Sequence, residues 1–480
     1  MPVNSFVYFY SMKIHLSYCC IVILSFGLLL SSCKKDSFIT SPDARLYINA
    51  DTLKYDTVFT ATGSITQSFK IINQNDQKLR LSKVKLMGGA VSSFKMNVNG
   101  AAGAEVSDLE IAANDSIYIF VAVNINPNTA NLPFIVSDSI LISYNNNQSF
   151  VQLQAYGQNA NFLSNTTITG NVNWTSTRPY VILGGIRIDT TATLNIAAGC
   201  KIYAHANAPF LIDGTLIING TKNNEAVFSG DRLDNDYKDL PASWPGLYFR
   251  NTSKNNVLTY AVIKNAYQAV VVQNPSVNSN PKIVLHQCII DNAYDAGLYC
   301  INSSLQADNC LITNCGSNIA LIYGGDYTLT HCTVAAYSTA YITHKNPLLS
   351  VSNFATTTSG TVTNNLNALF RNCIFWADTT GFVPNEVVVN KQGSNAFTVL
   401  FDTNMYRGAN DPANSTLTGN IRNADPSFDS IDITKHYFDF RITKNNLAPG
   451  INKGTVTAFT KDLDNRNRNN GLPDLGCYEK

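Results

Sequence analysis

"LHQCIIDN", residues 285–292, returns twice farther along the chain, as "ADNCLITN" at 307–314 and as "LTHCTVAA" at 329–336. The cysteines of the three copies are Cys288, Cys310 and Cys332, so each copy begins twenty-two residues after the one before it. Two residues beyond each cysteine stands an aliphatic side chain, in turn Ile290, Ile312 and Val334. A fixed period of this length is typical of a chain built from stacked repeats.

The repeats predict strands rather than helices, because brief apolar stretches alternate with polar residues and end at Asn or Gly. Side chains two apart on a strand share one face, so each cysteine and the following aliphatic residue point the same way. Copies stacked about 4.8 Å apart would form coils of a parallel β-helix. "LTYAVIKN" at 258–265 and "LFRNCIFWA" at 369–377 extend the series, and second strands are expected at "GLYCINS", "IALIYGG" and "YITHK".

Two columns of the repeat are predicted to be ladders in the β-helix. The cysteines are expected to be buried free thiols that pack as small apolar groups. Disulfides are the alternative for an exported chain, but stacked side chains do not point toward one another. Asparagines four residues after the cysteine column, where left-handed backbone and amide stacking are expected at a corner, are Asn265, Asn292 and Asn314.

Composition excludes one class of partner. Of the 480 residues only 14% are charged, and the formal net charge is +1. A nucleic-acid binder needs a basic surface, so we expect no nucleic-acid partner. We also predict that the protein is a monomer.

The N-terminus is predicted to be a targeting segment over residues 1–33, with translation starting at Met12. Its end, "LSSC" at 30–33, resembles the lipobox of bacterial lipoproteins, in which the signal is cut before the cysteine and the cysteine carries the lipids. The resemblance implies that Cys33 anchors the chain in the outer membrane or at the cell surface, since two or more acyl chains anchor stably. An ordinary signal peptide is the alternative. Residues 34–44 are predicted to form a polar tether.

Residues 45–159 contain short alternating strands separated by turns such as "NQNDQK" and "NVNGAAG". Strands of this length and spacing predict an Ig-like β-sandwich without a disulfide. The segment resembles the bacterial Ig-like modules that precede surface domains, which implies a spacer.

Residues 160–480 resemble the right-handed parallel β-helix proteins of the pectate-lyase-like superfamily, and more closely the exported β-helix lipoproteins of no established activity. The segments that carry the resemblance beyond the repeat are 193–249, 424–454 and 462–479, which ends in "GLPDLGCYE". The resemblance implies the fold and leaves the substrate open. The fold class predicted for the whole chain is therefore all-β, a sandwich followed by a β-helix.

One acidic cluster is a candidate metal site. Hard carboxylate oxygens on a loop suit Ca²⁺, and four aspartates crowd into one loop: Asp231, Asp234, Asp236 and Asp239. Arg232 and Lys238 stand among them, so a solvated loop is the alternative. No other cofactor is predicted.

Catalytic signals are sparse in the central coils, which contain no Arg and no Glu between Arg250 and Arg371. A β-helix glycosidase needs paired carboxylates, whereas the aspartates here occupy four different columns: Asp291, Asp295, Asp308 and Asp326. The histidines His286, His331 and His344 show no partner in the sequence. We assign no catalytic residue, and the sequence favours a protein without enzymatic activity.

Three function classes follow from these features. The first is a surface lipoprotein whose β-helix binds glycan or a protein partner. The second is a polysaccharide lyase or hydrolase, and the third is a structural part of an envelope assembly. Asp-Ser and Asp-Thr pairs are either O-glycosylation acceptors or strand starts, at Thr52, Thr57, Ser116, Ser139, Thr190, Thr379 and Ser430.

Overall fold

The computed structural model describes residues 37–60, 62–378, 383–468 and 471–480, in two compact units. The first unit contains residues up to 127 and 134–157, and the second contains 128–133 and 158–480. The regular secondary structure of the described chain is almost entirely β, which confirms the predicted fold class. Its helical content is one 3₁₀ turn, Gly89–Val91. No described helix is long and apolar enough to cross a membrane. The predicted lipidation residue Cys33 and the acceptor Thr379 lie outside the described residues.

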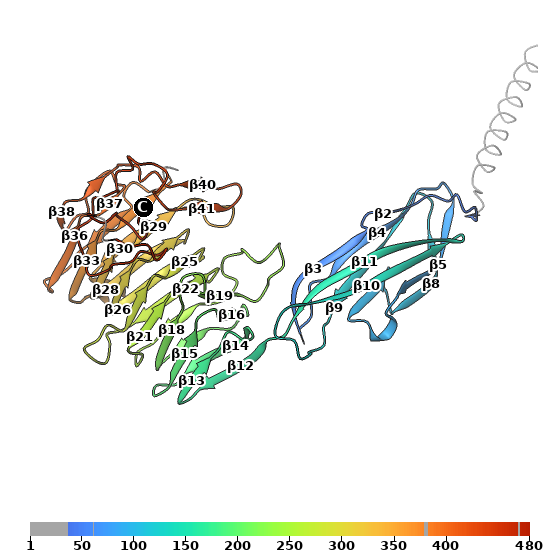
Figure 1. The fold of residues 1–480 in the computed structure, drawn as a ribbon, viewed down its shortest axis with the longest axis horizontal. Coiled ribbons are helices and arrows are strands. Elements are labelled where there is room, and N and C mark those ends of the chain that lie inside the picture. The colour runs from blue at the N-terminus through green and yellow to red at the C-terminus, as the bar shows by residue number, and fades with distance from the viewer. Residues whose placement is uncertain (1–36, 61, 379–382, 469–470) are drawn as a thin grey trace, which may run out of the picture. The chain divides into compact units, whose positions relative to one another are not determined.

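The first unit is a sandwich of two mainly antiparallel sheets (Figure 1). Alternating side chains of both sheets point inward, such as Leu81, Ile142, Phe69 and Ile119, which are fully buried. One sheet has the order β1 (Phe38–Ile39), β5 (Lys78–Leu86), β10 (Phe134–Tyr144), β11 (Asn147–Gln158) and β3 (Thr52–Phe59), with β8 (Glu105–Ile111) also on β5. The other has the order β2 (Leu46–Ile48), β4 (Gln67–Asn73), β9 (Ser116–Val123), β6 (Phe94–Val98) and β7 (Ala101–Ala102).

The second unit is a parallel β-helix, in which the coils contribute strands to three parallel faces, except that the third face ends at β35 (Figure 1). The first face consists of β13 (Asn171–Trp174), β15 (Thr193–Ala197), β18 (Thr215–Asn219), β21 (Asn256–Thr259), β24 (Ile283–His286), the second halves of β26 (Ala296–Asp308) and β28 (Ser317–Thr330), β33 (Leu366–Arg371), β36 (Phe397–Asp402) and β38 (Thr416–Thr418).

The second face consists of the first halves of β12 (Asn161–Ile168) and β14 (Tyr180–Ile188), β16 (Lys201–Ala204), β19 (Ala226–Gly230), β22 (Ala261–Lys264), β25 (Ile289–Asp291), β27 (Leu311–Thr313), β29 (Thr333–Ala336), β34 (Ile374–Ala377), β37 (Met405–Tyr406) and β39 (Ile421–Arg422). The third consists of the second halves of β12 and β14, β17 (Phe210–Ile212), β20 (Leu247–Phe249), β23 (Gln268–Gln273), the first halves of β26 and β28, β30 (Leu349–Ser352) and β35 (Val387–Asn390). Two hairpins lie outside the faces, β31 (Phe354–Thr357) with β32 (Gly360–Thr363) and β40 (Ser430–Asp432) with β41 (Tyr437–Asp439).

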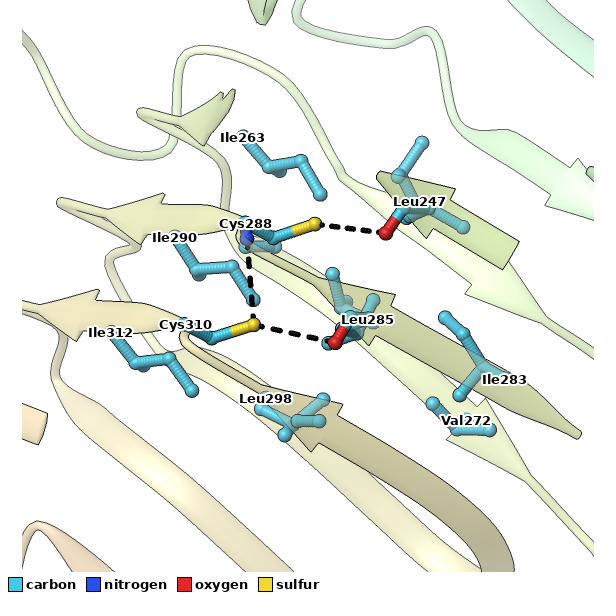
Figure 2. Close-up of a cluster of buried hydrophobic side chains, with 14 of the residues drawn as sticks. Leu247, Ile263, Val272, Ile283, Leu285, Cys288, Ile290, Leu298, Cys310 and Ile312 are labelled. Carbon is cyan, nitrogen blue, oxygen red and sulfur yellow. Dashed lines mark hydrogen bonds between the residues drawn. The ribbon is translucent and has the colours of Figure 1, made fainter. Parts of the chain in front are cut away.

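The cysteine column lies inside the β-helix, at the corner between the first and second faces. Figure 2 shows Cys288 and Cys310 one above the other, with Ile290 and Ile312 beside them in the core. Strand register places further buried members in the same column, where Cys200, Ala226 and Ala261 precede Cys288 and where Cys332, Cys373 and Asn404 follow Cys310.

The thiols also complete the hydrogen bonding of this corner. The Cys288 amide donates to Cys310 Sγ (3.4 Å), and Cys310 Sγ lies within donor distance of the carbonyls of Leu285 (3.6 Å) and Asp308 (3.3 Å). Asn404 replaces a cysteine as the acceptor at the C-terminal end of the column, because the Cys373 amide donates to Asn404 Oδ1 (2.8 Å). The cysteine is therefore a small apolar residue that also pairs with backbone groups turned away from the strand ladder. All eight described cysteines are buried and free.

One predicted strand is absent. "YITHK", residues 341–345, lies in a loop, and the strand of that coil begins only at Leu349, which pairs with Ile319. The Thr339 hydroxyl accepts the amides of Tyr341 (3.3 Å) and Ile342 (3.0 Å), which bends the chain away from the ladder. Local side-chain bonds of this kind compete with strand pairing.

The C-terminal segment folds back over the outer surface of the β-helix. Phe440, Leu463 and Cys477 pack with Leu311 and Ala335 of the second face. The polar contacts that hold the segment to successive coils run from Gln287 to the Asp462 carbonyl, from Arg468 to Asn309, and from Asn372 to the Thr455 carbonyl. The "GLPDLGCYE" segment thus stabilises the stack from outside.

Candidate functional site

The asparagine ladder turns the corner between the second and third faces. Asn265, Asn292 and Asn314 all have left-handed backbone, with φ of 62°, 56° and 52°. Asn292 Nδ2 donates to Asn265 Oδ1 (2.8 Å), but Asn314 Nδ2 points to Asp291 Oδ1 (3.3 Å) instead of Asn292. The amide ladder therefore has one step rather than the two predicted, because a carboxylate competes as acceptor.

A polar pocket of about 200 Å³ opens at this ladder, and we name it the corner pocket. The loop that contains Asp231 to Asp239, which we name the first loop, forms one wall. The carbonyls of Lys238 and Asp239 accept hydrogen bonds from the side-chain amides of Asn265 and Asn292. Another wall is the β40–β41 hairpin, whose His436 ring stacks on Tyr341 with centroids 5.9 Å apart. The lining consists of Asp239, Lys264, Asn265, Asp291, Asn292, Asn314, Thr339, Tyr341, Lys435, His436 and Phe438.

The corner pocket brings acids and bases together. Lys264 and Asp291 are register partners on adjacent coils of the second face. Asp291 Oδ1 accepts from Thr313 Oγ1 (2.8 Å), and burial raises the pKa of the Asp291 carboxyl. Lys435 pairs with Asp432 (3.4 Å). An acid with a raised pKa beside an amine and an imidazole is an arrangement used for proton transfer.

The four aspartates of the candidate calcium loop have separate surroundings. Asp231 pairs with His205 (2.7 Å) and Asp234 pairs with Arg232 (2.9 Å), while Asp236 and Asp239 are exposed. No group of three or more His, Cys, Asp or Glu side chains in the described chain lies close enough to hold a metal ion. Two of the four carboxylates have their own side-chain partners, His205 and Arg232, and calcium binding by this loop stays a prediction.

A second candidate site is a groove on the first face, formed by two adjoining pockets of about 320 and 430 Å³ that share Pro275, Ser304 and Asp326. Its floor is a row of outward side chains at coil spacing, because Ser304, Asp326, Asn367 and Thr398 are successive register partners. Asn367 Nδ2 donates to Asp326 Oδ1 (3.0 Å). We call this the loop groove, since residues 275–281 form one wall.

Hydrogen bonds to the preceding coil fix residues 275–281, the wall of the loop groove. The side-chain amides of Asn278 and Asn280 both donate to Asn255 Oδ1 (2.9 Å each). At the base of the loop, the fully buried Lys282 donates to the carbonyls of Arg250 (3.1 Å) and Gln273 (2.6 Å). Burial lowers the pKa of Lys282 to about 8. Because its ammonium group is buried and bonded to backbone carbonyls, Lys282 stabilises the base of the loop and does not line the groove.

The histidines that show no partner in the sequence have partners in the structure. His286 Nδ1 contacts Asp308 Oδ1 (2.6 Å), and this contact raises the pKa of His286. His344 Nε2 contacts Glu386 Oε2 (3.0 Å), and Arg407 holds the other Glu386 oxygen (2.5 Å). Glu386 is fully buried, so this ion cluster is structural. His286 and Asp308 stand at the same position of adjacent copies, twenty-two residues apart, so the repeat itself could have revealed this pair. The His344–Glu386 pair was hidden, because an insertion lengthens its spacing to 42 residues.

No protein-family model and no curated protein matches the chain. Among solved structures, the catalytic unit of a thermostable GH87 α-1,3-glucanase from Streptomyces thermodiastaticus strain HF3-3 is 10% identical, over 74% of this chain and 88% of that one, with a TM-score of 0.19. PapD-like domain 7 of human CEP192 is 7% identical, over 26% of this chain and 92% of that one, with a TM-score of 0.18.

A family 123 glycoside hydrolase from Clostridium perfringens is 13% identical over 24% of this chain, with a TM-score of 0.17. The matched part spans 26% of that enzyme's length. At these identities and TM-scores the similarities carry no argument about function.

Proposed function

We propose that the protein is a lipid-anchored surface lipoprotein whose β-helix binds a polysaccharide without cleaving it. In this proposal Cys33 carries the lipids, and the N-terminal sandwich, taken as Ig-like, is a spacer between the membrane and the β-helix. The loop groove is the binding site. Low net charge and the scarcity of charged residues agree with a ligand recognised mainly through hydroxyl groups.

The observation that carries the proposal is the chemistry of the loop groove. Its lining consists of Asn, Ser, Thr and Gln side chains with a few apolar ones, and Asp326 alone among the lining residues is ionisable. Hydrogen-bonding groups repeated at coil spacing suit a polymer of hydroxylated units. Acid–base cleavage of a glycosidic bond needs a second ionisable group near the first, so this lining favours binding.

A glycan array probed with the full chain in detergent tests the proposal. Binding to at least one polysaccharide is expected, and Asp326→Ala with Asn367→Ala should weaken it at least tenfold. Asp236→Ala is the matched control, since it removes an exposed carboxylate from the first loop. An array without any bound glycan, or equal weakening by the control, would contradict the proposal.

The corner pocket favours a second candidate function, a polysaccharide lyase or hydrolase. Asp291, Lys264 and His436 all line this pocket, and we expect proton transfer there in this second candidate function. Product release that is lost in Asp291→Asn would support this function. Unaltered pectin, alginate and glycosaminoglycans, followed by unsaturated uronate absorbance and reducing ends, would exclude it for these substrates.

A further inference from the structure

Two exposed tyrosines stack at the corner where the third face begins. The Asp295 amide donates to the Tyr267 carbonyl (2.9 Å), which places Tyr294 on the coil next to Tyr267. Their ring centroids lie 6.0 Å apart with an angle of 26° between the planes. Tyr267 is 45% exposed and Tyr294 is 54% exposed, so the paired rings present an open surface to solvent.

Two further tyrosines continue this surface onto the strands. Tyr248 pairs with Val271, and Val271 pairs with Tyr299, so the two tyrosines lie two coils apart in one row. Both point outward, because the residues that flank each of them on its strand are fully buried. Burial raises the pKa of Tyr248 and of Tyr299, and the Asp295 carboxylate adds to the rise in pKa at both rings. We name the four tyrosines the tyrosine platform.

Polar groups accompany the rings. Gln268 Nε2 donates to Asp295 Oδ2 (2.7 Å) in the space beside Tyr267, and Tyr248 Oη donates to the Pro245 carbonyl (3.1 Å). Tyrosine hydroxyls are protonated at neutral pH, so those of Tyr248 and Tyr299 can donate hydrogen bonds. The platform therefore combines flat aromatic surface with hydrogen-bonding groups.

We propose that the tyrosine platform binds an uncharged glycan, with sugar rings lying on Tyr267 and Tyr294 and sugar hydroxyls bonded to Asp295 and Gln268. This inference rests on the proposed function and adds a second surface, on a different face from the loop groove. It also names the ligand class as neutral.

The chemistry of the platform selects this ligand over others. The Asp295 carboxylate disfavours uronates and sulfated sugars through charge repulsion. The two stacked rings are nearly parallel, so they form a shelf and not the enclosing cage that binds ammonium groups. Tyr248 and Tyr299 are separated by two coil steps, about 10 Å, so a polymer lying along the helix axis would meet rings repeatedly.

Affinity electrophoresis in gels containing laminarin, dextran or konjac glucomannan tests the inference, with polygalacturonate as the charged comparison. We expect at least one neutral polymer to retard the protein. Tyr267→Ala with Tyr294→Ala should weaken this binding about tenfold or more, which corresponds to about 1.4 kcal/mol. The matched control is Tyr118→Ala with Phe120→Ala, which removes a stacked pair of similar exposure from the sandwich (centroids 5.8 Å apart, 41% and 42% exposed).

The outcomes separate the platform from the loop groove. If Asp326→Ala weakens binding of a neutral polymer and the tyrosine variant does not, the platform is refuted while the proposed function stands. Equal weakening by the control pair, or retardation by polygalacturonate alone, would also refute it. If the tyrosine variant changes only the sedimentation coefficient, the platform contacts a second copy of the chain and the glycan inference is wrong. Unfolding midpoints of all variants establish that each one is folded.

Discussion

Replacing Cys310 with Asp should be far more damaging than replacing it with Asn, although the two side chains have nearly the same size. Cys310 is fully buried, and its sulfur faces the carbonyls of Leu285 (3.6 Å) and Asp308 (3.3 Å). An asparagine amide can donate to these carbonyls, as Asn404 does to the Phe370 carbonyl (2.9 Å) in the same column. A carboxylate there would face two oxygens and no cation.

The loss of folding free energy can be calculated from the pKa of the new carboxyl, which must stay protonated in the folded Asp variant. A carboxyl that stays protonated at pH 7, although its ordinary pKa is near 4, costs about 4 kcal/mol of folding free energy. Cys310→Asn should cost about 1 kcal/mol, and so should Cys310→Ala, since Ala261 already occupies this column. The carboxyl pKa is raised in the folded state, so the penalty is full at neutral pH and vanishes as the pH falls toward 4.

Urea unfolding followed by circular dichroism at pH 7 and at pH 4.5 measures these differences, with the wild-type chain as reference. Equal stability of the Asp and Asn variants at pH 7 would mean that the column faces solvent. A penalty that did not shrink at the lower pH would refute the electrostatic argument while leaving the burial intact.

The remaining predictions concern acid sensitivity, a buried ion cluster and membrane anchoring. Burial lowers the pKa of His331 to about 2, so the unfolded chain binds a proton below pH 6.5 that the folded chain does not, and stability falls with pH by about 1.4 kcal/mol per unit. His331→Asn should reduce that slope in unfolding titrations between pH 6.5 and 4, and an unchanged slope would contradict the burial argument. Asparagine suits the left-handed φ of 53° at this position, as it does at Asn309 and Asn372 of the same corner. Glu386→Ala should destabilise by about 3–5 kcal/mol in urea unfolding, because Arg407 then keeps a buried charge without its partner, and a loss below 1 kcal/mol would show that the cluster is hydrated. Cys33→Ser should move the protein from the membrane fraction to the soluble fraction. Unchanged acyl labelling of this variant would refute the prediction that Cys33 carries the lipids.

The β-helix could be predicted from the sequence because the repeat is regular in the three central coils. Twenty-two-residue steps between Cys288, Cys310 and Cys332 reveal the column, and the column reveals the coil. Its other members, such as Cys200 and Asn404, were missed because loops of different length separate them from the regular copies. The hydrogen bonds of the thiols were missed too, since a period identifies a face and not the backbone groups that it meets.

The candidate sites were less predictable, because each is assembled from distant segments. The corner pocket needs His436 of a C-terminal hairpin beside Asn292 of a central coil, and no spacing links them. Residues 274–282 lengthen the step from Ala261 to Cys288, but their role as the wall of a groove depends on amide contacts to Asn255 that no spacing reveals. The partners of the clustered aspartates were unpredictable for a related reason. Closeness in sequence gathers the four aspartates, but it does not show that Asp231 pairs with His205 and Asp234 with Arg232.

The central claim is that the β-helix binds a polysaccharide and leaves it intact, and one measurement tests both halves. The polymer that the glycan array identifies is incubated with the protein, with and without calcium, and its molar mass is followed by light scattering after the complex is dissociated in denaturant. We predict binding with an unchanged molar mass and no new reducing ends. A falling molar mass that is restored by Asp291→Asn would contradict the claim and establish the corner pocket as a catalytic site.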